Sequence, residues 1–122
     1  MIEIEQFKNL RLQGGFVIKD IELTEDPIAD AIGREAVGQT RIVAHEFRLL
    51  IRSGLSDEEL SITLYHEILE AAAVAAADPP AGLVDFNEGD FEQAARAAHE
   101  RWGNASPANL NRLLQFHGFR GQ

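Results

Sequence analysis

The organisation of this chain is decided by residues 56–78, which read SDEELSITLYHEILEAAAVAAAD. This segment has the start signals of an α-helix, because Ser56 is a natural N-cap and Glu59, three residues later, completes a capping box. Asp78 and the two prolines that follow it predict the end of the helix, since proline cannot continue a helix. We therefore expect one helix of about 20 residues, roughly 30 Å long at 1.5 Å per residue.

Within this helix, the stretch LYHEILEA (residues 64–71) places a histidine and two glutamates at positions i, i+1 and i+4. Positions i and i+4 lie about 6 Å apart on one helix face, so the side chains of His66 and Glu70 can converge on one metal ion. Glu67 is then placed to take a proton from a water molecule on that ion. Burying these polar groups in an apolar helix without partners would be costly, and a divalent cation would satisfy them.

A second helix is predicted over residues 88–102, with Asn87 as its cap. Glu88, Glu92 and His99 fall at i, i+4 and i+11, on one face of it. A third metal ligand from this face would complete a three-ligand site with an open position for water. The sequence leaves open the alternative that these are solvated positions, because the helix dipole alone favours a glutamate near a helix start. The predicted apolar stripe of this helix consists of Phe91, Ala94, Ala95, Ala98 and Trp102.

Three strands are predicted in the first half of the chain, over residues 1–12, 16–23 and 40–51. Gly14-Gly15 predicts a turn that joins the first two strands into a hairpin. On the third strand, consecutive residues point to opposite faces, so His45 and Glu46 cannot act as a helical histidine–glutamate pair. We expect His45 to lie on the apolar face of that strand.

Two further helices complete the predicted order of elements. Asp26-Pro27 opens a short helix that Gly38 ends, and Ser106-Pro107 begins a last helix that stops near Gly118. His117 then lies in the last turn, where a cation suits the helix dipole. The resulting order β-β-α-β-α-α-α indicates an α+β fold, with a small mixed or antiparallel sheet packed against a layer of three to four helices.

The composition limits the class of protein. A chain of 122 residues with 45% hydrophobic residues fits a single domain, residues 1–122, with a real core. The formal net charge of -9 argues against nucleic-acid binding, because phosphate recognition requires a basic surface. No apolar run approaches the ~18 residues of a membrane span, and the start lacks a signal-peptide pattern, so we expect a cytoplasmic protein. With no cysteine, a metal site would have to use histidine and carboxylate ligands.

Residues 40–102 resemble the core of the small zincin-like metallopeptidases, in which a strand and an acidic turn precede a helix with the motif T-L-x-H-E-x-x-H. The specific part of the resemblance is the helix motif, which here reads TLYHEILE over residues 63–70. The resemblance implies a zincin-like fold and a divalent metal cofactor, zinc first. It also implies hydrolysis of a peptide or protein substrate, for which the third strand would offer its edge to an extended chain.

The same resemblance implies roles for individual residues. His66 and Glu70 would be metal ligands, and Glu67 would be the general base. Asn87-Glu88 resembles the downstream Asn-Glu signature of members whose third ligand is a glutamate on the next helix. In other small members that glutamate lies in an E-x-x-A helix, which would match Glu92.

The chain departs from the family at Glu70, where the family has its second histidine ligand. A His-Glu-Glu set carries more negative charge than His-His-Glu, which would weaken the Lewis acidity of zinc and favour harder ions such as Mn²⁺ or Mg²⁺. Two outcomes follow: a metal-dependent hydrolase, or a catalytically inactive zincin-fold domain that serves as a protein-binding or structural module. In the second, the HEILE segment would form a charged hydrogen-bond cluster with Arg96 or Arg101.

Overall fold

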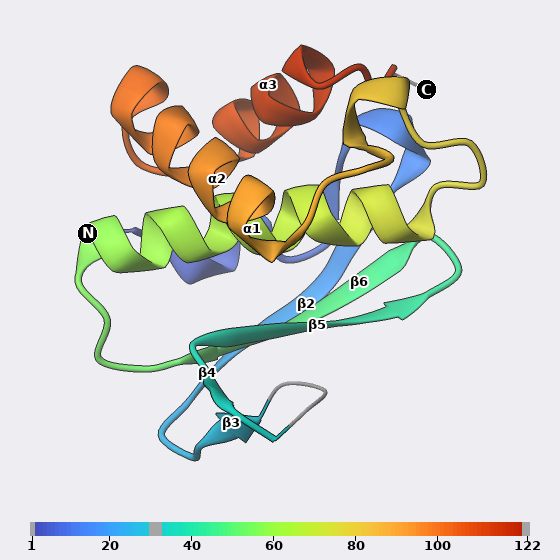
Figure 1. The fold of residues 1–122 in the computed structure, drawn as a ribbon. Coiled ribbons are helices and arrows are strands. Elements are labelled where there is room, and N and C mark those ends of the chain that lie inside the picture. Colours follow the sequence, from blue (N-terminus) through green and yellow to red (C-terminus); the bar gives the residue numbers. More distant parts are fainter. Residues whose placement is uncertain (1, 30–32, 121–122) are drawn as a thin grey trace.

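The computed structural model describes residues 2–29 and 33–120, and it has an α+β architecture (Figure 1). Within these residues the α-helices are α1 (Asp57–Ala75), α2 (Glu88–Trp102) and α3 (Pro107–Phe116). A four-stranded sheet contains β1 (Leu10–Arg11), β2 (Val17–Thr24), β6 (Glu46–Arg52) and β5 (Gly38–Val43), in that spatial order. A small second sheet pairs β3 (Ile28–Ala29) with β4 (Glu35–Ala36), and short 3-10 helices span Ile4–Phe7, Gln13–Gly15 and Ala81–Leu83.

The larger sheet is mixed. β1 runs antiparallel to β2 and β5 runs antiparallel to β6, whereas the two central strands, β2 and β6, are parallel. Because β5 is the last strand in the order, its outer edge has no partner within this sheet. Both the mixed sheet and the helical part therefore confirm the predicted α+β class, with three α-helices in the described residues.

Helix α1 lies between the sheet on one side and helices α2 and α3 on the other (Figure 1). Its buried residues accordingly surround the helix rather than forming one stripe, and Leu64, Tyr65, Ile68 and Leu69 are all fully buried. A helix buried all round is expected to be apolar all round. This position explains why the few polar side chains of α1 need partners from neighbouring elements.

The predicted starts of α1 and α2 are confirmed. The Ser56 hydroxyl accepts from the backbone N–H of Glu59, and the Glu59 carboxylate accepts from the N–H of Ser56, at 3.1 and 3.0 Å. Asn87 and Asp90 make the same reciprocal pair at the start of α2. On α2, Phe91, Ala95 and Ala98 are buried and Ala94 and Trp102 are partly buried, so the predicted apolar stripe is confirmed.

The prediction of one continuous strand over residues 40–51 is wrong. The chain reverses at Ala44 and His45, and the two antiparallel strands β5 and β6 pair Val43 with Glu46 and Thr40 with Leu49. Ala44 has a φ of 57°, a backbone conformation that turns usually assign to Gly, Asn or Asp, so the sequence carries no ordinary turn signal here. His45 is consequently exposed in the turn instead of lying on an apolar strand face.

Two predictions for the first part of the chain are also wrong. Residue 1 of the predicted strand 1–12 lies outside the described part. Of residues 2–12, only Leu10–Arg11 pairs with β2, because residues 4–7 form a 3-10 helix. The predicted helix that opens at Asp26-Pro27 is replaced by strands β3 and β4, and Gly38 begins a strand instead of ending a helix. Residues 30–32 of that predicted helix lie outside the described part.

None of the helices in residues 2–29 and 33–120 has the length and apolar character needed to cross a membrane.

Candidate metal centre

The predicted site residues line one cleft of about 1140 Å³. Strand β5 and the segment before it form one wall, and α1 with the first turns of α2 forms the other. His66, Glu67 and Glu70 come from α1, whereas Glu88 and Glu92 come from α2. The fold therefore brings together side chains that are up to 26 residues apart in the chain.

The imidazole of His66 lies at the centre of this group, and its side chain is only 12% exposed. Its Nε2 atom lies 2.7 Å from Oε1 of Glu88 and 3.7 Å from Oε1 of Glu70. Its Nδ1 atom lies 2.8 Å from Oε1 of Glu92. The other carboxylate oxygen of Glu92 accepts a 2.9 Å bond from Nε of Arg96, one helical turn further on. Glu70 and Glu88 thus lie on one side of the ring and Glu92 on the other.

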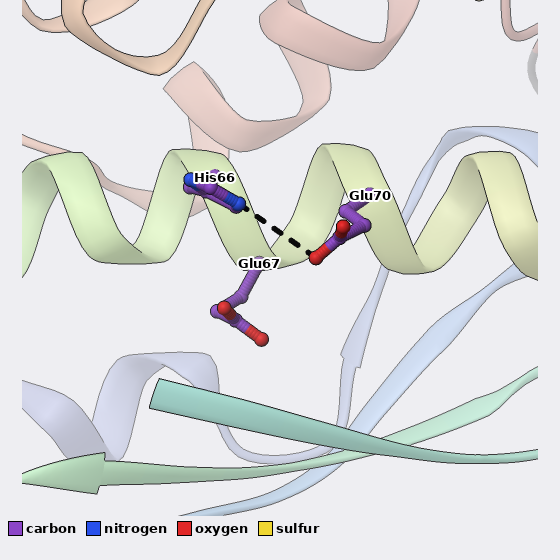
Figure 2. A group of neighbouring side chains, drawn as sticks. All are labelled: His66, Glu67 and Glu70. Atoms are coloured by element: carbon purple, nitrogen blue, oxygen red, sulfur yellow. Dashed lines mark ion pairs between the residues drawn. The ribbon is translucent and has the colours of Figure 1, made fainter. Parts of the chain in front are cut away.

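Glu67 points away from His66, from α1 toward the strands below it (Figure 2). Its Oε1 atom accepts a 2.8 Å hydrogen bond from Oγ1 of Thr40 on β5. Strand and helix approach closely at this point, because a Cβ placed on Gly38 would lie 3.0 Å from Cγ2 of Thr63 and 3.4 Å from Cγ of Glu67. Edge strand β5 therefore fixes the orientation of the Glu67 carboxylate.

The surroundings shift the pKa values of these groups in different directions. Burial disfavours a charge on His66, but the contacts with Glu70 and Glu92 and the charges of Glu67 and Glu88 outweigh it and raise the pKa of His66 to about 10. Burial also raises the pKa of Glu67, against the hydrogen bond from Thr40. The contact with His66 lowers the pKa of Glu70. The neighbouring carboxylates thus favour the charged imidazolium form of His66, and burial favours the protonated form of Glu67.

The donor atoms fit a divalent cation. His66, Glu67 and Glu70 each offer one ligand atom, and these atoms all lie within 4.8 Å of one another. A tetrahedral ion with bonds of about 2.0–2.2 Å places its ligand atoms roughly 3.3–3.6 Å apart. The 3.7 Å between Nε2 of His66 and Oε1 of Glu70 is close to that spacing. Glu88 lies nearer to Nε2, at hydrogen-bond distance, so its exposed side chain would need to move away from the ring to reach that spacing.

The other histidines lie outside this group. Nδ1 of His99 is 2.8 Å from Oγ of Ser61, a buried hydroxyl that also accepts the backbone N–H of Ala105. The ring of His45 stacks on Phe16 at 5.3 Å. His117 is the C-cap of α3 and contacts the Phe116 ring, and burial lowers its pKa, which opposes the charged form expected at a helix C-terminus. The spacing of residues on α2 predicted that His99 lies with Glu88 and Glu92. In the structure, the partner of His99 is instead Ser61 on α1.

Thr40 and Gly38 are the site residues that the sequence did not indicate. Both lie on β5, and nothing in the local sequence relates that strand to the position of Glu67 on α1. Arg96 takes part in the charged cluster through Glu92. Arg101, the other arginine considered for that role, lies instead over the ring of Phe116, at 5.2 Å.

No protein-family model, curated protein or solved structure matches this chain. A function is therefore supported only by the geometry and charges of the residues that line the cleft.

Proposed function

We propose that this chain is a metal-dependent hydrolase of the peptidase type, with residues 63–70 as a zincin-like active-site helix. One observation carries the proposal: an imidazole and carboxylates from two helices converge in one cleft, with Nε2 of His66 2.7 Å from Glu88 and 3.7 Å from Glu70. Such a concentration of carboxylates around one ring favours a divalent cation, because the positive charge relieves their mutual repulsion.

In this proposal His66, through Nε2, binds the ion together with Glu70 and Glu88. Zinc is the first candidate, and the two carboxylate ligands also suit Mn²⁺ or Mg²⁺. When bound, the ion would polarise a substrate carbonyl and lower the pKa of water in the cleft. Glu88 is in the first turn of α2, where the positive end of the helix dipole stabilises its negative charge.

Glu67 is the general base of the proposed reaction. Its raised pKa moves the group toward neutral pH, where a base is most effective at taking a proton and returning it. The hydrogen bond from Thr40 occupies Oε1, and Oε2, which has no hydrogen-bond partner among residues 2–29 and 33–120, would accept a proton from water. The residue that orients the base therefore comes from the strand that forms the opposite wall of the cleft.

The shape of the cleft suits an extended peptide. The outer edge of β5 is unpaired within its sheet, and an extended chain can add to such an edge through backbone hydrogen bonds. Val37 and Val74 line the cleft and are 51% and 70% exposed, so apolar side chains of a substrate would find partners there. A peptide or protein substrate and a cytoplasmic location are the corresponding expectations from the sequence.

A second candidate function is a zincin-like domain without catalysis that acts through protein contacts. The observation that favours it is that His66 has hydrogen-bond partners on both ring nitrogens, at 2.8 and 2.7 Å. The charged cluster is thus satisfied by the protein alone, and it would then connect α1 to α2 as a structural element.

Metal analysis separates the two functions. Protein purified without added metal, or loaded with Zn²⁺ or Mn²⁺ and desalted, should hold close to one ion per chain by elemental analysis under the first function. His66→Ala should lose that ion, whereas the matched control Glu58→Gln, an exposed carboxylate in the first turn of α1, should keep it. A wild-type protein that takes up no divalent ion would overturn the hydrolase proposal and leave the structural cluster.

Catalysis needs its own variant, because metal binding alone does not establish it. Glu67→Gln preserves the shape of the side chain and removes its basicity, so it should keep the ion and lose hydrolysis of a fluorogenic peptide library. Undiminished turnover in this variant would exclude Glu67 as the base.

A further inference from the structure

The two nitrogens of the His66 ring contact different glutamates. Nε2 faces Glu88 and Glu70, the two proposed carboxylate ligands. Nδ1 faces Glu92 at 2.8 Å, on the other side of the ring. Because the two ring nitrogens point in diverging directions, an ion bound at Nε2 cannot also be bound by a carboxylate that lies against Nδ1.

We infer that Glu92 is a positioning residue of the proposed metal site and not one of its ligands. It accepts the Nδ1–H of His66, which fixes the tautomer of the ring and presents the lone pair of Nε2 to the cleft. This inference depends on the proposed metal site, and it assigns a different role to a glutamate that spacing alone makes an equal candidate for the third ligand.

The bonds of Glu92 leave little freedom for another role. Oε1 lies against His66 and Oε2 accepts from Nε of Arg96 at 2.9 Å, so both carboxylate oxygens have partners. When an ion occupies Nε2, the single proton of the neutral imidazole is on Nδ1, and the ionised Glu92 carboxylate, which can only accept, is placed to accept it. Carboxylates placed in this way raise the basicity of a histidine ligand and hold the ring in position, and their loss commonly costs about 10- to 100-fold in metal affinity.

Arg96 supports this arrangement more weakly. Its side chain is 63% exposed, and exposed ion pairs contribute little to stability because water screens them. We therefore expect Arg96→Gln to weaken metal binding by no more than a few fold, and Glu92→Ala to weaken it by about 100-fold. Glu92→Gln retains a neutral acceptor oxygen and should lie between, at about tenfold.

The experiment uses the full chain labelled with ¹⁵N at histidine. Zn²⁺ and ¹¹³Cd²⁺ are the probes, and long-range ¹H–¹⁵N NMR spectra identify which ring nitrogen of His66 carries the proton and which binds the metal. The expected result is a proton on Nδ1 and cadmium coupling to Nε2 in the wild type. In the metal-bound protein, Glu92→Ala should then bind more weakly and show metal on either ring nitrogen, Glu92→Gln should restore the form with the proton on Nδ1, and Glu58→Gln should match the wild type.

The possible failures are distinguishable. Metal coupled to Nδ1, or a Glu92→Ala protein with unchanged affinity and tautomer, would overturn the positioning role while the metal site itself stands. Absence of any ion in the wild-type protein would overturn the metal site, and the positioning role with it. Circular dichroism of each variant confirms that the helices are retained, so a loss of affinity is not a loss of fold.

Discussion

Thr40 and Glu67 join the edge strand to the central helix, through a 2.8 Å hydrogen bond from the threonine hydroxyl to the glutamate carboxylate. The two residues are 27 positions apart in the chain. This bond fixes the carboxylate that we propose as the base, and it does so from the strand along which a substrate would bind. Loss of this hydrogen bond should therefore affect both the stability of the fold and the orientation of the proposed base.

Replacement of Thr40 by valine tests this contact, because the two side chains have nearly the same shape. Loss of a hydrogen bond to a charged group is expected to lower the free energy of unfolding by about 1.5–3 kcal/mol. The pKa of Glu67 should also rise further, since the Thr40 hydroxyl now lowers it. Urea unfolding and NMR titration of the carboxyl carbon measure the two effects. Thr24→Val on β2, where the hydroxyl only accepts a local N–H at the surface, is the control, and equal losses in both variants would contradict the prediction.

The close approach of β5 and α1 predicts that Gly38→Ala destabilises the protein. The added Cβ would lie 3.0 Å from Thr63 and 3.4 Å from Glu67, and overpacking of this kind costs about 1–3 kcal/mol. Gly82→Ala is a matched control, because nothing lies within 4 Å of its added Cβ. Urea unfolding should separate the two variants clearly. If both unfold at the same urea concentration, the strand and helix are not packed as described.

The pKa of His66 predicts how stability depends on pH in the metal-free protein. Its folded-state value of about 10 is above the ordinary value of 6.5, so the unfolded chain releases this proton first as the pH rises. The stabilisation is therefore complete below pH 6.5 and is lost progressively as the pH rises through about 10. Thermal unfolding in the presence of a chelator should show this decline for the wild type and a weaker one for His66→Gln. Parallel curves for the two proteins would show that the carboxylates do not hold an imidazolium.

The contacts of Ser61 predict that its replacement lowers the free energy of unfolding, although Ser61 lies outside the proposed site. Its fully buried hydroxyl joins His99 on α2 to the N–H of Ala105, both at 2.8 Å. Ser61→Ala leaves these two groups without that partner, which should cost about 1–3 kcal/mol. A double-mutant cycle with His99→Ala, measured by urea unfolding, should give a coupling energy well above zero. Additive losses would indicate that the two side chains are independent.

The sequence by itself determined the helical half of this protein and indicated the histidine and the glutamates of its candidate site. Capping boxes at Ser56 and Asn87 define where α1 and α2 begin. In a capping box, two side chains three residues apart accept hydrogen bonds from the free backbone N–H groups at the helix start. The spacing of His66 and Glu70 follows from the helical repeat in the same way. These are local relationships, and local sequence is sufficient to specify them.

Only the tertiary structure decided the strands, the orientation of Glu67 and the positions of the two glutamates of α2 around His66. The reversal at Ala44 lacks a turn residue, and its conformation is imposed by the pairing of β5 with β6. Thr40 reaches Glu67, and Glu92 lies on the opposite side of His66 from Glu88, because of how a strand and a second helix pack against α1. Such contacts join residues far apart in the chain, so their geometry depends on packing and register and not on any local spacing.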